Sequence, residues 1–207
     1  QELRGAVQRG EFVLHCQPQI DATTGRISGL EALIRWHHRQ NGLISPMKFI
    51  PVAEEIGVIE ELGAWVLNEA CQQFAAWKAA GVHAKRIAVN LSAHQLRSPN
   101  LVRLVRTTMN RHGIGAGELE LEVTESVAME DPQRAIAQLE ALRTMGVELA
   151  IDDFGTGYSS LAYLKLLPIQ TLKLDRSFVK DIETDENDAT ISLATLALAH
   201  SLGLKVV

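Results

Sequence analysis

Five polar side chains stand at the ends of short apolar runs, and their types and spacing could do chemistry. They are four carboxylates and one amide: Glu31, Asn90, Glu122, Asp152 and Asp153. Carboxylates that lie close together in a low-dielectric site repel one another, so they take up protons or bind cations. Because these ligands offer only oxygen, with no Cys or His among them, they favour Mg²⁺ or Mn²⁺ over zinc. The pattern therefore predicts a divalent-metal hydrolase.

The apolar runs that carry these residues predict buried parallel strands. The runs cover residues 27–33, 87–92, 119–126 and 147–155. Helical patterns alternate with them; over residues 59–80, for example, apolar side chains recur at steps of three and four residues. Strands that alternate with helices imply a parallel sheet with right-handed crossovers.

Two α/β folds satisfy this order, a TIM-type (β/α) barrel and an open doubly wound sheet. Polar residues at the ends of several strands favour the barrel, because barrels take their catalytic groups from the carboxyl ends of different strands. Gly29, Ala88 and Ala150 each stand two residues before one of the polar residues, on the same strand face. Such small side chains leave room in a barrel interior.

The N-terminal segment differs from the alternating order. We expect an amphipathic helix over residues 1–9 and a strand over Phe12–Ile20. Turn residues at 21–26, with Gly25 suited to a positive φ, predict a hairpin between this strand and the next. The chain shows no linker, so we expect one domain over residues 1–207.

Size, composition and charge exclude several classes of protein. The chain of 207 residues can bury a sizeable core, and 46% hydrophobic with 22% charged residues is typical of soluble proteins. A net charge of −5 argues against binding of long nucleic acid, which calls for a basic face. Two cysteines, Cys16 and Cys71, favour a reducing compartment. Without an apolar run of transmembrane length or a signal peptide, we expect a cytoplasmic domain, either of a soluble protein or of a membrane-anchored signalling protein.

Simpler interpretations compete with the functional ones. A single Asp at a strand–helix junction is more often a helix cap than a ligand, and the alternation of Glu120 and Glu122 with apolar residues also fits a half-exposed strand. The loop at 155–160 resembles a phosphate cradle, but a hinge explains it equally well, because it lacks a P-loop lysine. Lys173 lies between two leucines, and a buried lysine needs an anionic partner, which the carboxylates would supply. None of the seven histidines receives a role.

Five short motifs also occur in a fixed order along the chain. They are Glu31-Ala32-Leu33 followed by Arg35-Trp36, Asn90-Leu91-Ser92, Glu122-Val123-Thr124-Glu125-Ser126, Asp152-Asp153-Phe154-Gly155-Thr156-Gly157-Tyr158-Ser159-Ser160-Leu161, and Lys173-Leu174-Asp175-Arg176-Ser177-Phe178. In this order they resemble the motifs of the EAL domain, a bacterial signalling phosphodiesterase that hydrolyses cyclic di-GMP. The resemblance runs from about Leu3 to the last residue.

The resemblance implies a site with two ions of Mg²⁺ or Mn²⁺. The metal ligands would be Glu31, Asn90, Glu122 and Asp152 for one ion, with Asp152 and Asp153 for the second. Lys173 would hold the attacking water, so the catalytic residues would be Glu31 and Lys173. The substrate contacts would be Gln17, Leu33, Arg35 and Asp175, with Arg35 at phosphate, and Glu125 would position the Asp152-Asp153 loop.

The same resemblance implies the reaction and the partners. Cyclic di-GMP would be cut to linear pGpG by a two-metal mechanism, or bound without cleavage if the domain is a degenerate receptor or signalling scaffold. We expect a homodimer attached to sensory or GGDEF-type domains, with no long nucleic acid as a partner.

The resemblance also implies a TIM-type barrel whose first strand runs antiparallel to its neighbour. In EAL domains an Ala-Glu-Gly-Val-Glu stretch, whose first glutamate serves the catalytic site, follows the position of Val207. We therefore expect the C-terminal part of the barrel to be missing from the chain.

Overall fold

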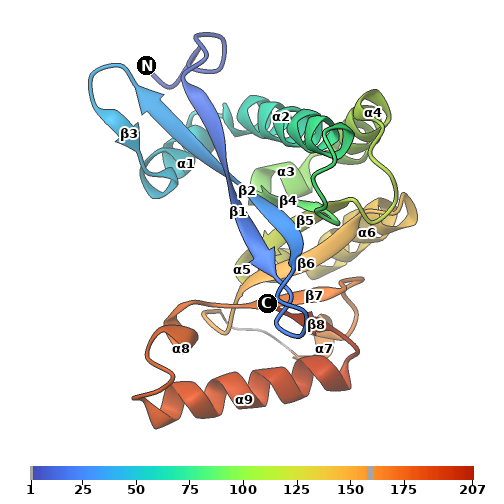
Figure 1. Cartoon of the computed structure of the whole chain (residues 1–207). Coiled ribbons are helices and arrows are strands. Elements are labelled where there is room, and N and C mark those ends of the chain that lie inside the picture. Colours follow the sequence, from blue (N-terminus) through green and yellow to red (C-terminus); the bar gives the residue numbers. More distant parts are fainter. Residues whose placement is uncertain (1, 158–160) are drawn as a thin grey trace. The chain divides into compact units, whose positions relative to one another are not determined.

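Strands and helices alternate along most of the chain, in a computed structural model that describes residues 2–157 and 161–207 (Figure 1). Contacts between Cα atoms separate the chain into two compact units, Gln1–Glu120 and Leu121–Val207. The boundary falls inside strand β5 (Leu119–Thr124). The number of independently folding domains stays a prediction.

A long antiparallel hairpin opens the first unit. Strand β1 (Phe12–Ile20) pairs with β2 (Ile27–His38), which confirms the predicted hairpin (Figure 1). Asp21 Oδ1 stabilises the turn by accepting hydrogen bonds from the backbone N–H groups of Thr23 and Thr24, at 3.0 and 2.8 Å. Gly25 has a φ of 67°, which a residue without a Cβ adopts at little cost.

The rest of the first unit adds two strands and four helices. Strand β3 (Gly42–Ile44), which the sequence analysis missed, pairs antiparallel with β2, and β4 (Ile87–Leu91) pairs with β2 in parallel. The helices are α1 (Pro46–Glu55), α2 (Ile59–Ala79), α3 (Ala93–Arg97) and α4 (Leu101–His112). Helices α2 and α4 lie side by side (Figure 1).

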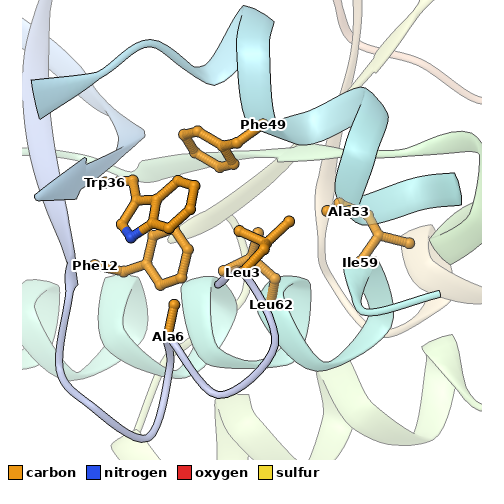
Figure 2. Close-up of a cluster of buried hydrophobic side chains, with 8 residues drawn as sticks. All are labelled: Leu3, Ala6, Phe12, Trp36, Phe49, Ala53, Ile59 and Leu62. Atoms are coloured by element: carbon orange, nitrogen blue, oxygen red, sulfur yellow. The ribbon is translucent and has the colours of Figure 1, made fainter. Parts of the chain in front are cut away.

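An aromatic cluster anchors the hairpin to the helices of this unit. Figure 2 shows its buried residues, Leu3, Ala6, Phe12, Trp36, Phe49, Ala53, Ile59 and Leu62. Phe12 and Trp36 face each other in the β1–β2 register with ring centroids 5.8 Å apart, and Phe49 of α1 lies 5.6 Å from Phe12. The indole N–H of Trp36 is satisfied by Glu11 Oε2 at 3.1 Å.

Two segments of the first unit differ from the sequence prediction. Residues 2–10 form successive turns, not a helix, and Gly5 and Gly10 have φ values of 77° and 67° that no right-handed helix contains. From the sequence we expect one helix between the strand at 87–91 and His112, but the structure has two, α3 and α4. Ser98 precedes Pro99 and is extended, with φ −70° and ψ 126°, as a residue before proline must be.

The second unit holds its strands in the order β5, β6, β7 and β8. Neighbours β6 (Glu148–Phe154) and β7 (Thr171–Leu174) are parallel, as are β7 and β8 (Lys205–Val206). The helices are α5 (Glu125–Glu130), α6 (Pro132–Thr144), α7 (Leu161–Leu164), α8 (Ser177–Lys180) and α9 (Glu186–Ser201). Helices α5 and α8 were not predicted. None of the helices in the described part of the chain combines the length and apolar composition that a membrane crossing requires.

Strand β5 is buried along most of its length. Glu120 and Glu122 both have exposed fractions of 0%, so the alternative of a half-exposed strand is wrong. A buried carboxylate needs a compensating cation, and each has one within its own unit. Arg86 Nε lies 3.1 Å from Glu120 Oε1, and Lys173 Nζ lies 2.7 Å from Glu122 Oε2.

Truncation of the aromatic cluster tests its contribution to stability. Phe49→Ala should lower the free energy of unfolding by about 3–5 kcal/mol, because it removes a buried ring and leaves a cavity. Leu43→Ala, at a residue with an exposed fraction of 54%, is the matched control and should cost less than about 1 kcal/mol. Urea unfolding gives both values, and equal losses would contradict the assignment of this cluster as the core.

Candidate functional site

Glu31 and Asn90 meet where the parallel pairing of β2 and β4 ends. Glu31 is opposite Ala88 in the register, and Asn90 lies two residues further along β4, on the same face as Ala88. Asn90 Nδ2 donates a hydrogen bond of 3.0 Å to Glu31 Oε1. The structure thus brings together the two predicted ligands of the first unit.

The predicted substrate contacts of the first unit share one face of the hairpin. Glu31, Leu33 and Arg35 alternate along β2 and are half-buried, whereas Ala32 between them is buried on the opposite face. Gln17 of β1 lies directly opposite Glu31 and is exposed. Arg35 Nη1 donates to the carbonyl oxygen of Ile34 at 2.8 Å, so its guanidinium stays close to the backbone of β2.

A buried lysine bridges two carboxylates in the second unit. Lys173 of β7 has an exposed fraction of 8%, and its Nζ lies 2.7 Å from Glu122 Oε2 and 3.0 Å from Asp152 Oδ2. The expected anionic partner of Lys173 is therefore confirmed. The ammonium offsets the repulsion between the two carboxylates and the cost of burying them. An environment that holds a cation between carboxylate oxygens also suits a metal ion.

The backbone becomes irregular at the two aspartates that end β6. The β6–β7 register shifts between Ile151 and Phe154, as it does at a β-bulge. Asp153 has a φ of 53°, and among the described residues it is the one non-glycine with a positive φ. Asp153 N donates to Asp152 Oδ1 at 3.0 Å. Such strain, of about 1–3 kcal/mol, persists only where the surroundings hold the backbone in place.

The surroundings of Asp153 raise the pKa of its carboxyl above the ordinary value. The largest cause is partial desolvation of this otherwise exposed residue, followed by the negative charges of Asp152 and Asp175. The pKa of Asp175 is lowered instead, chiefly by a hydrogen bond from the Ser177 hydroxyl and then by the Ser177 backbone N–H, at 2.8 Å from Oδ1. The pKa values of these two neighbouring carboxyls are thus shifted in opposite directions.

Glu125 contacts the backbone of the loop that follows Asp153. It begins helix α5, has an exposed fraction of 2%, and its Oε2 accepts a hydrogen bond of 2.7 Å from Gly155 N. A Cβ at Gly157 would lie 3.0 Å from Glu125 Oε1, so the chain passes closely over this carboxylate. The contact fits the loop-positioning role expected of Glu125. Of the predicted loop at 155–160, residues 158–160 lie outside the described part of the chain.

Sequence reasoning missed a second buried ion pair. Arg86 and Glu120 pair in the first unit, and Arg86 Nη2 also donates to Gln19 Oε1 at 3.2 Å. A Cβ at Gly29 would lie 2.8 Å from the same Gln19 oxygen, so this glycine makes room for the cluster. The signal was Glu120 itself, a charged residue in a strand of apolar neighbours. The Asp175-x-Ser177 spacing, typical of an Asx turn, could likewise have identified Ser177.

Comparison with known proteins identifies relatives of the whole chain. The family model described as the EAL domain matches residues 1–207. The chain is 49% identical over 206 residues to the bifunctional diguanylate cyclase/cyclic di-GMP phosphodiesterase MucR of Pseudomonas aeruginosa, covering 100% of this chain and 30% of MucR. It is 46% identical to the cyclic di-GMP phosphodiesterase NbdA of the same organism, covering 100% of this chain and 26% of NbdA. The chain thus spans less than a third of these two relatives.

A solved structure supports the fold assignment. The MucR phosphodiesterase in complex with c-di-GMP matches with a TM-score of 0.94 and 48% sequence identity, over 99% of this chain and 83% of that one. The predicted α/β fold of the TIM-type barrel class is confirmed, and so is its antiparallel first strand.

The raised pKa of Asp153 predicts how metal-free stability depends on pH. A carboxyl with a higher pKa in the folded state keeps its proton to a higher pH than it does when unfolded. Its ionisation therefore destabilises the fold as pH rises above the ordinary value of 3.8. Asp153→Asn, which also tolerates a positive φ, should raise the Tm at pH 7 and change it little at about pH 3.

A thermal-unfolding series over pH, in the presence of a chelator, measures this effect. Asp181→Asn is the matched control, because Asp181 is exposed and the charged side chain beside it is Lys180, at 3.9 Å, not another carboxylate. A variant at position 153 that is equally stabilising at both pH values would show that backbone strain, not ionisation, accounts for the gain.

Proposed function

Because the chain belongs to the EAL domain family, we propose that it hydrolyses cyclic di-GMP to linear pGpG with two bound Mg²⁺ or Mn²⁺ ions. The observation that supports this most directly is the group formed by buried Glu122 and Lys173 with partly buried Asp152. Charged residues are rarely buried unless they are paired. These residues lie at the ends of neighbouring strands, where barrel enzymes have their catalytic residues.

The donor set fits hard divalent cations. The proposed ligands of the first ion are Glu31, Asn90, Glu122 and Asp152, and those of the second are Asp152 and Asp153. All offer carboxylate or amide oxygen, which suits Mg²⁺ and Mn²⁺. Two such ions, when bound, polarise phosphoryl oxygens, lower the pKa of bound water and stabilise the leaving oxygen.

Lys173 is proposed to hold the attacking water. Its ammonium is fixed by Glu122 and Asp152 at 2.7 and 3.0 Å, so a water that accepts a hydrogen bond from Nζ would be placed beside the metal ligands. Positioning of a nucleophile contributes to the rate because the reactant is held in place before the reaction begins. Glu31 is proposed to serve the same step as both ligand and catalytic residue.

Substrate recognition is proposed for the hairpin face and the end of β7. Arg35 shares the face of Glu31 but lies four residues further along β2, so their Cα atoms are about 13 Å apart. A guanidinium fork at that distance suits a phosphate of the dinucleotide. Gln17 and Leu33, on the same face, and Asp175, after β7, are the other proposed contacts.

We further propose that the chain acts as one module of a longer signalling protein. The name of MucR includes a diguanylate cyclase, and the chain spans 30% of that protein, which supports attachment to GGDEF-type or sensory domains. The homodimer and the cytoplasmic location implied by the sequence belong to this proposal.

Product analysis tests the proposed reaction. With Mg²⁺ or Mn²⁺ the domain, prepared together with the C-terminal part of the barrel, should convert cyclic di-GMP to pGpG, and a chelator should abolish turnover until metal is restored. Chromatography of the nucleotides measures this. Substrate that binds but stays intact after long incubation would instead assign the chain as a receptor.

Substitutions at two glutamates three residues apart test which one binds metal and which one positions the loop. Glu122→Gln should abolish both metal binding and turnover, because a neutral amide is a poor ligand for a hard dication. Glu125→Gln should keep metal but lose about 10–100-fold in activity, since it weakens the contact with Gly155 N that orients the aspartates.

Calorimetry with Mn²⁺ and product analysis, run on both variants, distinguish these roles. Glu140→Gln, on the partly exposed face of α6, is the matched control. Equal loss of metal in Glu122→Gln and Glu125→Gln would overturn the proposed division.

A further inference from the structure

The side chain of Phe178, in helix α8, lies against the loop that follows the two aspartates. We propose that Phe178 is a positioning residue, which holds Gly155 in place and thereby fixes the backbone of Asp152 and Asp153. The inference rests on the proposed function of these aspartates as metal ligands. Its residues all belong to the second unit.

The contact between Phe178 and Gly155 is closer than any other residue at 155 would allow. A Cβ at Gly155 would lie 2.7 Å from Phe178 Cε2 and 3.3 Å from Cζ, so the edge of the ring occupies the space of a side chain. Gly155 also has a φ of 101°, which L-residues rarely adopt. Both the backbone angle and the ring therefore require glycine here.

Gly155 is held from another direction by Glu125. The carboxylate accepts the Gly155 N–H at 2.7 Å, so this residue has a charged acceptor on its amide and an aromatic ring at its Cα. Asp153, at φ 53°, is only two residues away. A strained residue keeps its conformation only when its surroundings fix the chain on both sides, and the hold on Gly155 supplies the C-terminal side.

The backbone of Phe178 is itself anchored. Ser192 of α9 is buried, with an exposed fraction of 3%, and its hydroxyl donates to the carbonyl oxygen of Phe178 at 3.0 Å. Phe178 N donates to the carbonyl oxygen of Asp175 at 3.2 Å, and Asp175 N donates to that of Phe154 at 3.3 Å. The ring is thus carried on a turn that is bonded both to α9 and to the end of β6.

If Phe178 only stabilised the fold, its truncation would have a different effect. The residue is half-buried, and truncation of an ordinary half-buried ring lowers overall stability without changing one particular loop. A positioning role instead requires that residues 153–157 become mobile and that metal binding weakens, even where the fold remains intact. Outer contacts that orient metal ligands are typically worth about 10–100-fold in affinity or activity.

Hydrogen–deuterium exchange of the metal-free protein and calorimetry with Mn²⁺ test the proposal. In Phe178→Ala, the Gly155 amide should exchange at least about tenfold faster, and Mn²⁺ should bind about 10–100-fold more weakly. The kcat should fall while the KM for cyclic di-GMP changes less than about twofold. Val179→Ala, at the adjacent residue with an exposed fraction of 46%, is the matched control and should match the wild type in all three measurements.

The outcomes separate this inference from the proposed function. Wild-type exchange at 153–157 or wild-type Mn²⁺ affinity in Phe178→Ala would overturn it, whatever happens to the Tm. If Phe178→Ala does not fold, Phe178→Leu replaces it, because leucine keeps the apolar volume but not the flat ring. The same changes in amide exchange, Mn²⁺ affinity and kcat are then expected, but smaller. A wild-type protein that binds Mn²⁺ but leaves the substrate intact would refute the proposed reaction, while the exchange and metal data would still decide the role of Phe178.

Discussion

The Lys173 ammonium between Glu122 and Asp152 is the interaction on which the second unit depends most. Removal of one partner of a buried pair typically costs about 3–5 kcal/mol, far more than a surface pair contributes. The pair also fixes register, because a slip of one residue would send Lys173 to the opposite face of β7. Burial of apolar side chains and pairing of charges thus select the same alignment of β5, β6 and β7.

An irregular backbone is the second requirement of the site. In a regular strand, neighbouring side chains point to opposite faces, so Asp152 and Asp153 could not both face the same side of β6. The register shift after Ile151 and the positive φ of Asp153 remove this restriction. The strain is local, and the Glu125 carboxylate helps to hold the loop in this conformation by accepting a hydrogen bond from the Gly155 amide.

Most of the architecture could be predicted from the sequence, because buried strands and turn residues leave strong local patterns. The hairpin and the anionic partners of Lys173 followed from the residue types alone. Helices α5 and α8 did not, since six and four residues are too short to show a helical period. Pro99 could have predicted the break between α3 and α4, but the apolar periodicity of the segment favoured one continuous helix. The ligand and substrate roles came from a resemblance and stay predictions, because side-chain chemistry does not by itself reveal what a site binds.

The Arg86–Glu120 pair has a consequence for how this sequence can diverge. Neither charge can be replaced alone without leaving the other buried and unpaired, and the Gly29 position cannot gain a side chain while Gln19 fills its space. Among descendants of this sequence, Arg86 and Glu120 should therefore be lost together or kept together, and Gly29 should change only along with Gln19. Such paired substitutions would identify this buried cluster in related sequences even where the surface residues no longer align.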